Sequence, residues 1–147
     1  MGTILNLLEK VRALDTEQVI INAVTETKDE ITQENKQQLF SGLDDNDNVI
    51  GDSKPYASAN YAFEKYQKNP IPGLGNPDLD DTGAFYAGMT IDISGSTIKQ
   101  YSTDSKNEEL IAKYPGIFGL GPVAKKEYIT DYLQQAVRVQ TRAILGI

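Results

Sequence analysis

The chain has 147 residues, the length of one ordinary domain, and 39% of them are hydrophobic. Its 21 acidic and 14 basic residues give a formal net charge of -7, which excludes ordinary nucleic-acid binding because phosphate contacts need clustered Lys and Arg. The chain has no cysteine and no histidine, so it lacks disulfides and the commonest general base and metal ligand. We therefore expect a protein that is not an enzyme and holds no metal or cofactor.

Residues 1–42 predict a helical N-terminal part. Apolar residues recur at helical spacing through residues 3–14, at Ile4, Leu7, Leu8, Val11 and Leu14. No basic segment of the kind that begins a secretory signal opens the chain. No window approaches the roughly 20 apolar residues that a membrane span requires.

A second, long helix is predicted to begin after Asp15 or Thr16 and to end before Gly42, with Gln18 in the capping-box position for Asp15. It would extend about 40 Å. Its middle, residues 25–36, is polar except for Ile31. Such a helix rarely packs on one small core alone. Two interpretations follow: a kinked or broken helix, or a helix that packs against neighbouring subunits.

The middle of the chain predicts short elements separated by turns. Residues 44–52 form a polar turn, and a short helix is expected to open with Pro55 near its first position. One face of this helix would carry Tyr56, Ala59, Phe63 and Tyr66. Residues 69–78 hold three prolines and two glycines, which predicts an ordered loop or an extended arm. Residues 79–86 predict a helical turn, for which the candidate caps are Asp80, Asp81 and Thr82.

The second half of the chain predicts a hairpin and two further helices. Residues 89–93 and 97–101 alternate like half-buried strands, which places a hairpin within residues 87–102. A short helix over residues 108–114, an apolar stretch and a final helix over residues 122–145 follow. No repeat or linker divides residues 1–147. We therefore predict a single α+β domain with long N-terminal helices, a small antiparallel sheet and a C-terminal helix.

One motif has the spacing of a calcium site. Asp44, Asn46 and Asn48 occupy alternate positions, as ligands do in an EF-hand loop. Val49 stands where the loop needs glycine, and Pro55 stands where it needs a bidentate glutamate. A turn rich in Asx residues is therefore the better interpretation.

Two further motifs also lack a required part. The glycines of residues 73–75 have neither the preceding strand nor the GKS or GKT ending of a phosphate loop. Residues 81–83 read Asp-Thr-Gly, as in aspartic proteases, but that chemistry needs two such carboxylates, usually on a mostly β fold. A helix N-cap, with its acids favoured by the helix dipole, explains this triplet without catalysis.

The order of these features resembles the small neck or tail-completion proteins of tailed bacteriophages, especially those of gut and crAss-like phages. The resemblance covers residues 36–120. It is carried by Gly51-x-x-x-Pro55-Tyr56, Leu79-x-Asp81-Thr82-Gly83-x-Phe85-Tyr86 and Tyr114-x-x-Ile117-Phe118-Gly119-Leu120. None of these segments is a catalytic or ligand-binding signature, so no functional residue is carried over.

The resemblance implies a non-enzymatic virion protein, assembled in the host cytoplasm, that forms a ring between the portal and the tail. Such a ring is a cyclic homo-oligomer in which one face of each copy meets a different face of the next. Twelve copies are implied if the ring sits on the portal, and this is favoured over six copies in a ring joined to the tail. DNA would pass through the lumen as cargo, and the acidic charge suits a conduit that does not grip it.

For the subunit contacts we select apolar and aromatic residues, most of them in the middle of the chain. These are Tyr61, Tyr66, Ile71, Leu74 and Phe118, because tyrosine and other large side chains are enriched in protein interfaces. Asp81, Thr82 and Gly83 are expected to fix the turn that leads into the hairpin. Two alternatives stay open: a monomeric acidic adaptor or inhibitor that binds another protein, and a hydrolase that uses Asp81 with a second acid.

Overall fold

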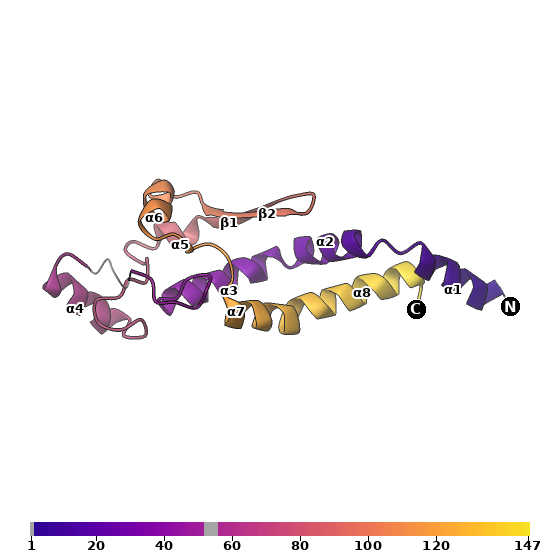
Figure 1. The fold of residues 1–147 in the computed structure, drawn as a ribbon, viewed down its shortest axis with the longest axis horizontal. Helices are drawn as coiled ribbons and strands as arrows, with labels where there is room; N and C mark the ends of the chain where they lie inside the picture. Colours follow the sequence, from indigo (N-terminus) through magenta and orange to yellow (C-terminus); the bar gives the residue numbers. More distant parts are fainter. Residues whose placement is uncertain (1, 52–55) are drawn as a thin grey trace.

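The N-terminal and C-terminal helices run side by side along the long axis of an elongated molecule (Figure 1). The computed structural model describes residues 2–51 and 56–147 of the chain. The N-terminal helices are α1 (Gly2–Arg12), α2 (Thr16–Glu26) and α3 (Lys28–Phe40). The C-terminal helix consists of α7 (Pro122–Tyr128), the π-helical turn η1 (Ile129–Leu133) and α8 (Gln134–Leu145).

The predicted hairpin is confirmed and lies alongside the N-terminal helices (Figure 1). Strands β1 (Met89–Ser94) and β2 (Thr97–Ser102) pair antiparallel, with Ile93 opposite Ile98 at the turn. At its open end lie the short helices α5 (Ala84–Ala87) and α6 (Asn107–Lys113). The predicted α+β class, with its small antiparallel sheet and its single domain, is therefore confirmed.

Two clusters of buried side chains hold these elements together. The first joins the end of α3 to α5, β1 and the segment after α6, and consists of Leu39, Ile50, Phe85, Met89, Tyr114 and Ile117. The second joins α3 to β1 and α7, and consists of Ile31, Ile91 and Tyr128. Burial of apolar area is the main favourable term in folding, and α3 and β1 each contribute to both clusters.

The start of α2 is capped as predicted. Asp15 is its N-cap, and the Asp15 carboxylate accepts a hydrogen bond from the Gln18 N–H at 3.1 Å. The second half of the predicted capping box is not formed, because the Gln18 side chain donates instead to Asn22 Oδ1 at 2.8 Å. Asp15 therefore satisfies one of the free N–H groups at this helix end without a reciprocal bond.

The predicted helix over residues 16–40 is divided at Thr27, as the broken-helix interpretation expects. Thr27 has φ -106° and ψ 20°, outside the helical range. Its Oγ1 donates to the carbonyl of Ala23 at 2.7 Å and lies 2.7 Å from the hydroxyl of Tyr128 on α7. A threonine that bonds back to the preceding turn bends a helix, and here Tyr128 adds a second partner that holds the bend.

Part of the polar face of α3 is buried within the same chain. Asn35 and Gln38 on α3 are 0% and 6% exposed. The Asn35 amide donates to the carbonyls of Ile117 at 3.1 Å and Gly119 at 3.3 Å. Gln38 donates to Gly119 at 3.0 Å and accepts from the N–H of Gly121 at 2.7 Å. The segment before α7 has no strand partner, so these two side chains supply hydrogen bonds to its backbone groups. The buried polar side chains on this face of α3 therefore find their partners within the chain.

The turn after α3 is an Asx turn, as predicted. Asp44 Oδ1 accepts hydrogen bonds from the N–H groups of Asn46 and Asn48, both at 2.9 Å. Asp47 Oδ2 accepts from the Val123 N–H at 3.1 Å and so caps α7, where Pro122 occupies the first turn. Of the residues expected in this turn and at the next helix start, Asp52 and Pro55 lie outside the described residues.

The short helix of the middle region begins later than predicted. Helix α4 (Ala59–Lys68) is capped by Ser58, whose hydroxyl accepts from the Tyr61 N–H at 3.3 Å. Tyr56 therefore precedes the helix rather than forming one face with Phe63 and Tyr66. The prediction took Pro55 as the mark of the helix start, whereas the side-chain oxygen of Ser58 supplies the cap.

Candidate protein interfaces

The end of the molecule that contains α4 is held by a buried ion pair. Lys65 Nζ of α4 lies 2.7 Å from Asp78 Oδ1, and the two side chains are 12% and 4% exposed. Lys65 also donates to the carbonyl of Asp80. Asn69 donates to Asp78 Oδ2 at 3.0 Å and to the carbonyl of Phe40 at 2.8 Å. These bonds fix α4 and the proline-rich segment to the end of α3.

The segment of residues 69–78 is an ordered loop rather than an extended arm. Its ends, Asn69 and Asp78, are buried, and so are two of its three prolines, Pro72 and Pro77. Between these anchors, Ile71 and Leu74 are 63% and 62% exposed. The loop therefore presents two large apolar side chains on a backbone that is tied down at both ends.

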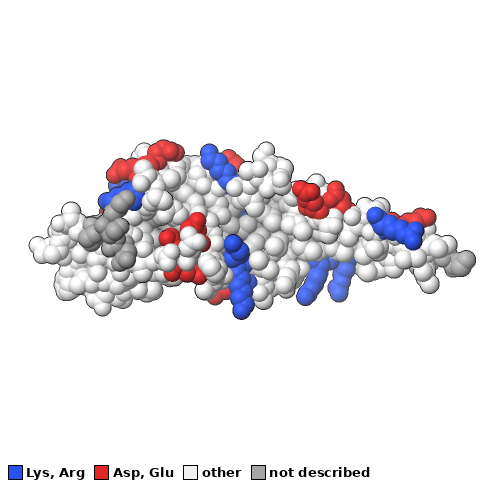
Figure 2. Space-filling view, viewed as in Figure 1, with Lys and Arg blue, Asp and Glu red and all other residues white. Residues whose placement is uncertain are grey.

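Helix α4, at the same end of the molecule, carries two more exposed apolar side chains. Phe63 and Tyr66 lie three residues apart on the helix and are 54% and 40% exposed. On the face shown in Figure 2, this end of the molecule carries hardly any charged side chains. We call Phe63, Tyr66, Ile71 and Leu74 the α4 patch. Of the residues selected for subunit contact, the structure brings Tyr66, Ile71 and Leu74 to this end.

Tyr61 has a different environment. It is 38% exposed, and its ring makes an edge-to-face contact with Tyr56, with the centroids 5.1 Å apart. Its hydroxyl donates to Asp81 Oδ1 at 3.5 Å. Burial raises the pKa of the Tyr61 hydroxyl, and the negative charge of Asp81 raises it further. Tyr61 therefore faces the turn at residues 80–82.

Phe118 is packed inside the chain. It is half-buried against the first core cluster, and its ring centroid lies 5.7 Å from that of Phe85. The segment that carries it is drawn against α3 by Asn35 and Gln38, which turns this apolar side chain inward. Phe118 thus packs against the core of its own chain, and its selection for subunit contact stays a prediction.

The triplet of residues 81–83 forms the turn into α5. Gly83 is the N-cap of this short helix and has φ 84°, a left-handed value that glycine adopts without strain. The Thr82 hydroxyl accepts from the Ala84 N–H at 3.3 Å. Asp81 does not cap the helix as expected; its carboxylate lies 3.6 Å from Lys106 Nζ. Helix α5 has four residues, so its end offers little dipole to attract an acid.

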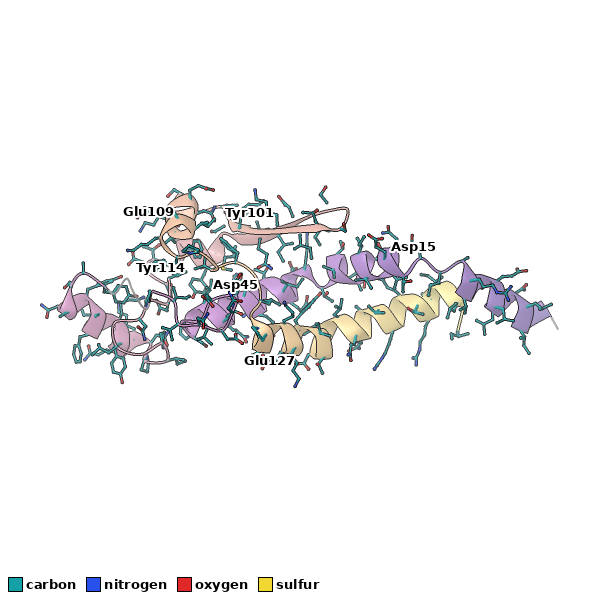
Figure 3. All side chains as sticks on the ribbon, in the orientation of Figure 1. Asp15, Asp45, Tyr101, Glu109, Tyr114 and Glu127 are labelled. Carbon is teal, nitrogen blue, oxygen red and sulfur yellow. The ribbon has the colours of Figure 1, made fainter. Side chains whose placement is uncertain are left out.

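Asp81 lines a surface hollow of about 260 Å³ between α4, the turn at residues 77–82 and α6. Figure 3 labels Glu109 and Tyr114, two residues of its α6 side. Both carboxylates and lysines line it, and the Asp81–Lys106 pair is exposed, at 62% and 57% for the two side chains. An exposed ion pair is a solvated arrangement, and the charged group beside the Asp81 carboxylate in it is an ammonium rather than a second carboxyl.

Two apolar surfaces were not selected from the sequence. The first is a face of α1, on which Ile4, Leu8 and Val11 are 70%, 46% and 49% exposed. The second is a groove between α2 and the hairpin, and its lining is given below. The helical spacing of Ile4, Leu8 and Val11 was visible in the sequence, but spacing alone does not tell whether a face is covered.

Charged groups of both signs are interspersed along the face shown in Figure 2. No continuous basic strip appears on that face. Within residues 2–51 and 56–147, no three acidic side chains are placed to hold a metal ion. No helix of these residues is long and apolar enough to cross a membrane.

Comparison with known proteins returned no match: no family model, no curated protein and no solved structure was found to be similar to this chain.

Proposed function

We propose that this protein is a structural subunit that assembles with copies of itself into a ring, in the portal-to-tail neck of a tailed bacteriophage. The observation that carries the proposal is the position of its exposed apolar side chains. The α4 patch lies at one end of the elongated molecule, and the exposed face of α1 lies at the other (Figure 1).

Two different apolar surfaces on one subunit are what a head-to-tail assembly requires. In such an assembly one face of each copy meets a different face of the next, and the chain of copies closes when the rotation between neighbours divides a full turn. Exposed apolar groups gathered together on an otherwise charged surface mark protein contacts. In this proposal the α4 patch is a contact between the subunit and its neighbour in the neck.

The charge of the chain supports the same role. A net charge of -7 per copy, without clustered Lys and Arg, repels DNA rather than binding it. A ring that lets DNA pass needs this property. By the resemblance described above, a twelvefold ring on the portal is favoured over a sixfold ring at the tail, and portal or tail proteins are the docking partners.

The test is the mass and shape of the particle in solution. Light scattering and negative-stain electron microscopy of the purified chain should show closed rings of many times the subunit mass of 16.2 kDa. The double variant Ile71→Asp with Leu74→Asp should stay close to that mass, because it places two charges in the α4 patch. Val123→Asp is the matched control, since Val123 on α7 is 60% exposed and lies outside the patch.

Three results decide the matter. Rings from the wild type and from Val123→Asp, with small species from the patch variant, support the proposal. A wild type that stays monomeric overturns it and favours the acidic adaptor or inhibitor. Normal rings from the patch variant remove the α4 patch from the contact.

A further inference from the structure

Within the part of the chain that the structure describes, no other element covers the apolar face of α1. Helix α1 lies beside the end of α8 and continues beyond the body of the molecule (Figure 1). A side-chain carbon at Gly146, the C-cap of α8, would lie 3.3 Å from Lys10 Nζ, so the two helix ends are in contact. This contact uses the basic side of α1 and leaves Ile4, Leu8 and Val11 in solvent.

An apolar groove of about 490 Å³ lies between α2 and the tip of the hairpin. Its apolar lining comes from both sides, with Ile20, Ile21 and Val24 on α2 and Ile93 and Ile98 on the hairpin. Ile20 and Ile98 are each 46% exposed. The groove is therefore an apolar surface that the chain itself does not cover.

We propose that α1 of one copy occupies the groove between α2 and the hairpin of the next copy. This inference rests on the proposed self-assembly and names a contact through which it occurs. Helix α1 is 11 residues long, about 16 Å, and the α2 side of the groove from Thr16 to Val24 extends about 13 Å. The apolar face of the helix is thus long enough to fill the groove, and its side chains would cover the apolar lining of the groove.

Charge complementarity sets the direction of the helix. Of the described residues that line the groove, Glu17 alone is ionisable, and it lies at the start of α2. Helix α1 has no acidic residue in its first turn and has Lys10 and Arg12 in its last turn. Since Lys10 lies beside the end of α8 of its own chain, Arg12 is the residue placed to meet Glu17 of the neighbouring copy.

A second copy fits the groove better than the chain's own helix does. The contact between Lys10 and the end of α8 holds α1 at the far end of the molecule, directed away from the hairpin (Figure 1). For α1 to reach its own groove, it would have to break this contact and fold back at residues 13–15. A neighbour's helix enters without either change.

Cross-linking tests the contact directly, because the chain contains no cysteine. Leu8→Cys and Ile98→Cys chains are mixed and treated with a short bis-maleimide. We expect covalent dimers that contain one chain of each variant. The pair Leu8→Cys with Val123→Cys is the control, since Val123 is more exposed than Ile98, at 60% against 46%, and lies outside the groove; it should give at most a trace of dimer.

A chain with both Leu8→Cys and Ile98→Cys separates the two occupants. A ladder of covalent oligomers supports the inference, whereas a monomer cross-linked within itself overturns it. Rings that form without any Leu8-to-Ile98 cross-link overturn the inference and leave the proposed function standing. A wild type that stays monomeric overturns both.

Charge reversal supplies a second readout that does not depend on cysteine placement. Glu17→Arg should lower the assembled fraction severalfold, and adding Arg12→Glu to the same chain should restore most of it. Circular dichroism establishes that each variant remains folded. If the double variant assembles no better than Glu17→Arg alone, the proposed pairing of these two residues is wrong.

Discussion

Lys65 and Asp78 form a buried ion pair of 2.7 Å that joins α4 to the end of the proline-rich loop. A buried pair is costly to break, because removing one partner leaves the other charge without compensation. Together with the hydrogen bonds of Asn69, this pair holds the helix and the loop that carry the α4 patch.

We expect Lys65→Met to lower the free energy of unfolding by about 3–5 kcal/mol, since it leaves Asp78 buried and unpaired. Lys106→Met is the control. It removes the exposed pair with Asp81, and we expect it to cost less than about 1 kcal/mol. Urea denaturation followed by circular dichroism measures both, and equal losses would show that burial does not distinguish the two pairs.

The hydroxyl contact between Thr27 and Tyr128, 2.7 Å long, can be tested by a double-mutant cycle. Tyr128→Phe should cost about 0.5–1.5 kcal/mol, because Thr27 keeps its bond to the Ala23 carbonyl. Thr27→Val should cost about 1–3 kcal/mol, since it leaves the buried Tyr128 hydroxyl without this partner. The double variant should be less destabilised than the sum of the two, and strict additivity would mean that the hydroxyls do not interact.

Gln38 on α3 is buried and its neighbour Gln37 is exposed, so replacing Gln38 should lower the free energy of unfolding much more than replacing Gln37. Gln38→Leu keeps the approximate size of the side chain but leaves the Gly121 N–H, which bonds to Gln38 Oε1 at 2.7 Å, without an acceptor. We expect a loss of about 1–3 kcal/mol in the free energy of unfolding. Gln37→Leu, at an exposed position, should stay within about 0.5 kcal/mol of wild type. Thermal melts of the two variants should separate clearly.

The contact between Gly42 and the loop can be separated from backbone strain. Gly42 has φ 78°, and a side-chain carbon there would lie 2.6 Å from Pro72 Cβ. Gly75 has a similar φ of 86°, but a side-chain carbon there would meet open space. Gly75→Ala should therefore cost only the left-handed strain of about 1–2 kcal/mol, and Gly42→Ala should cost more. Equal costs would mean that the loop shifts away freely.

Glu34 predicts an unusual dependence of stability on pH. It is 8% exposed, and burial raises the pKa of its carboxyl, with further increases from the charges of Glu127 and Asp131. Because the folded pKa lies above the unfolded value, Glu34 favours folding most at low pH, and this contribution is lost as the pH rises through the folded pKa.

Glu34→Gln should therefore raise the melting temperature at neutral pH, and the gain should shrink as the pH falls through the raised pKa of Glu34 and be lost below the ordinary range of glutamate. Glu26→Gln, at an exposed position on α2, should change the free energy of unfolding by no more than about 0.5 kcal/mol at any pH. Melting curves at a series of pH values measure both variants. A gain from Glu34→Gln that stays constant with pH would contradict the assignment.

Elements with local signals could be predicted from the sequence. Asp15 marks the start of α2, Pro122 the start of α7, and the alternation around Gly95 the hairpin. Each of these signals acts between residues a few positions apart, so it is readable along the chain. The prediction for α4 was wrong at its start, because Pro55 and Ser58 are both plausible first-turn residues and only the cap bond of Ser58 decides between them.

The surfaces were harder to predict than the elements. Ile71, Leu74 and Tyr66 were selected as apolar residues of a loop and a helix, and the structure exposes all three. Phe118 was selected on the same ground and is packed on Phe85, because Asn35 draws its segment onto α3 from 82 residues away along the chain. The residue type alone does not tell whether a large apolar side chain will be exposed or packed inside the chain.

The sequence by itself determined the fold class, the ends of most helices and the hairpin, since periodicity and capping depend on near neighbours. Only the tertiary structure decided where the long helix breaks, which polar side chains are buried and which apolar faces stay open. Thr27 and Tyr128 lie 101 residues apart, and their contact accompanies the break at a position that the sequence pattern did not give. The open faces are set by what the rest of the chain leaves uncovered, which is a property of the whole fold.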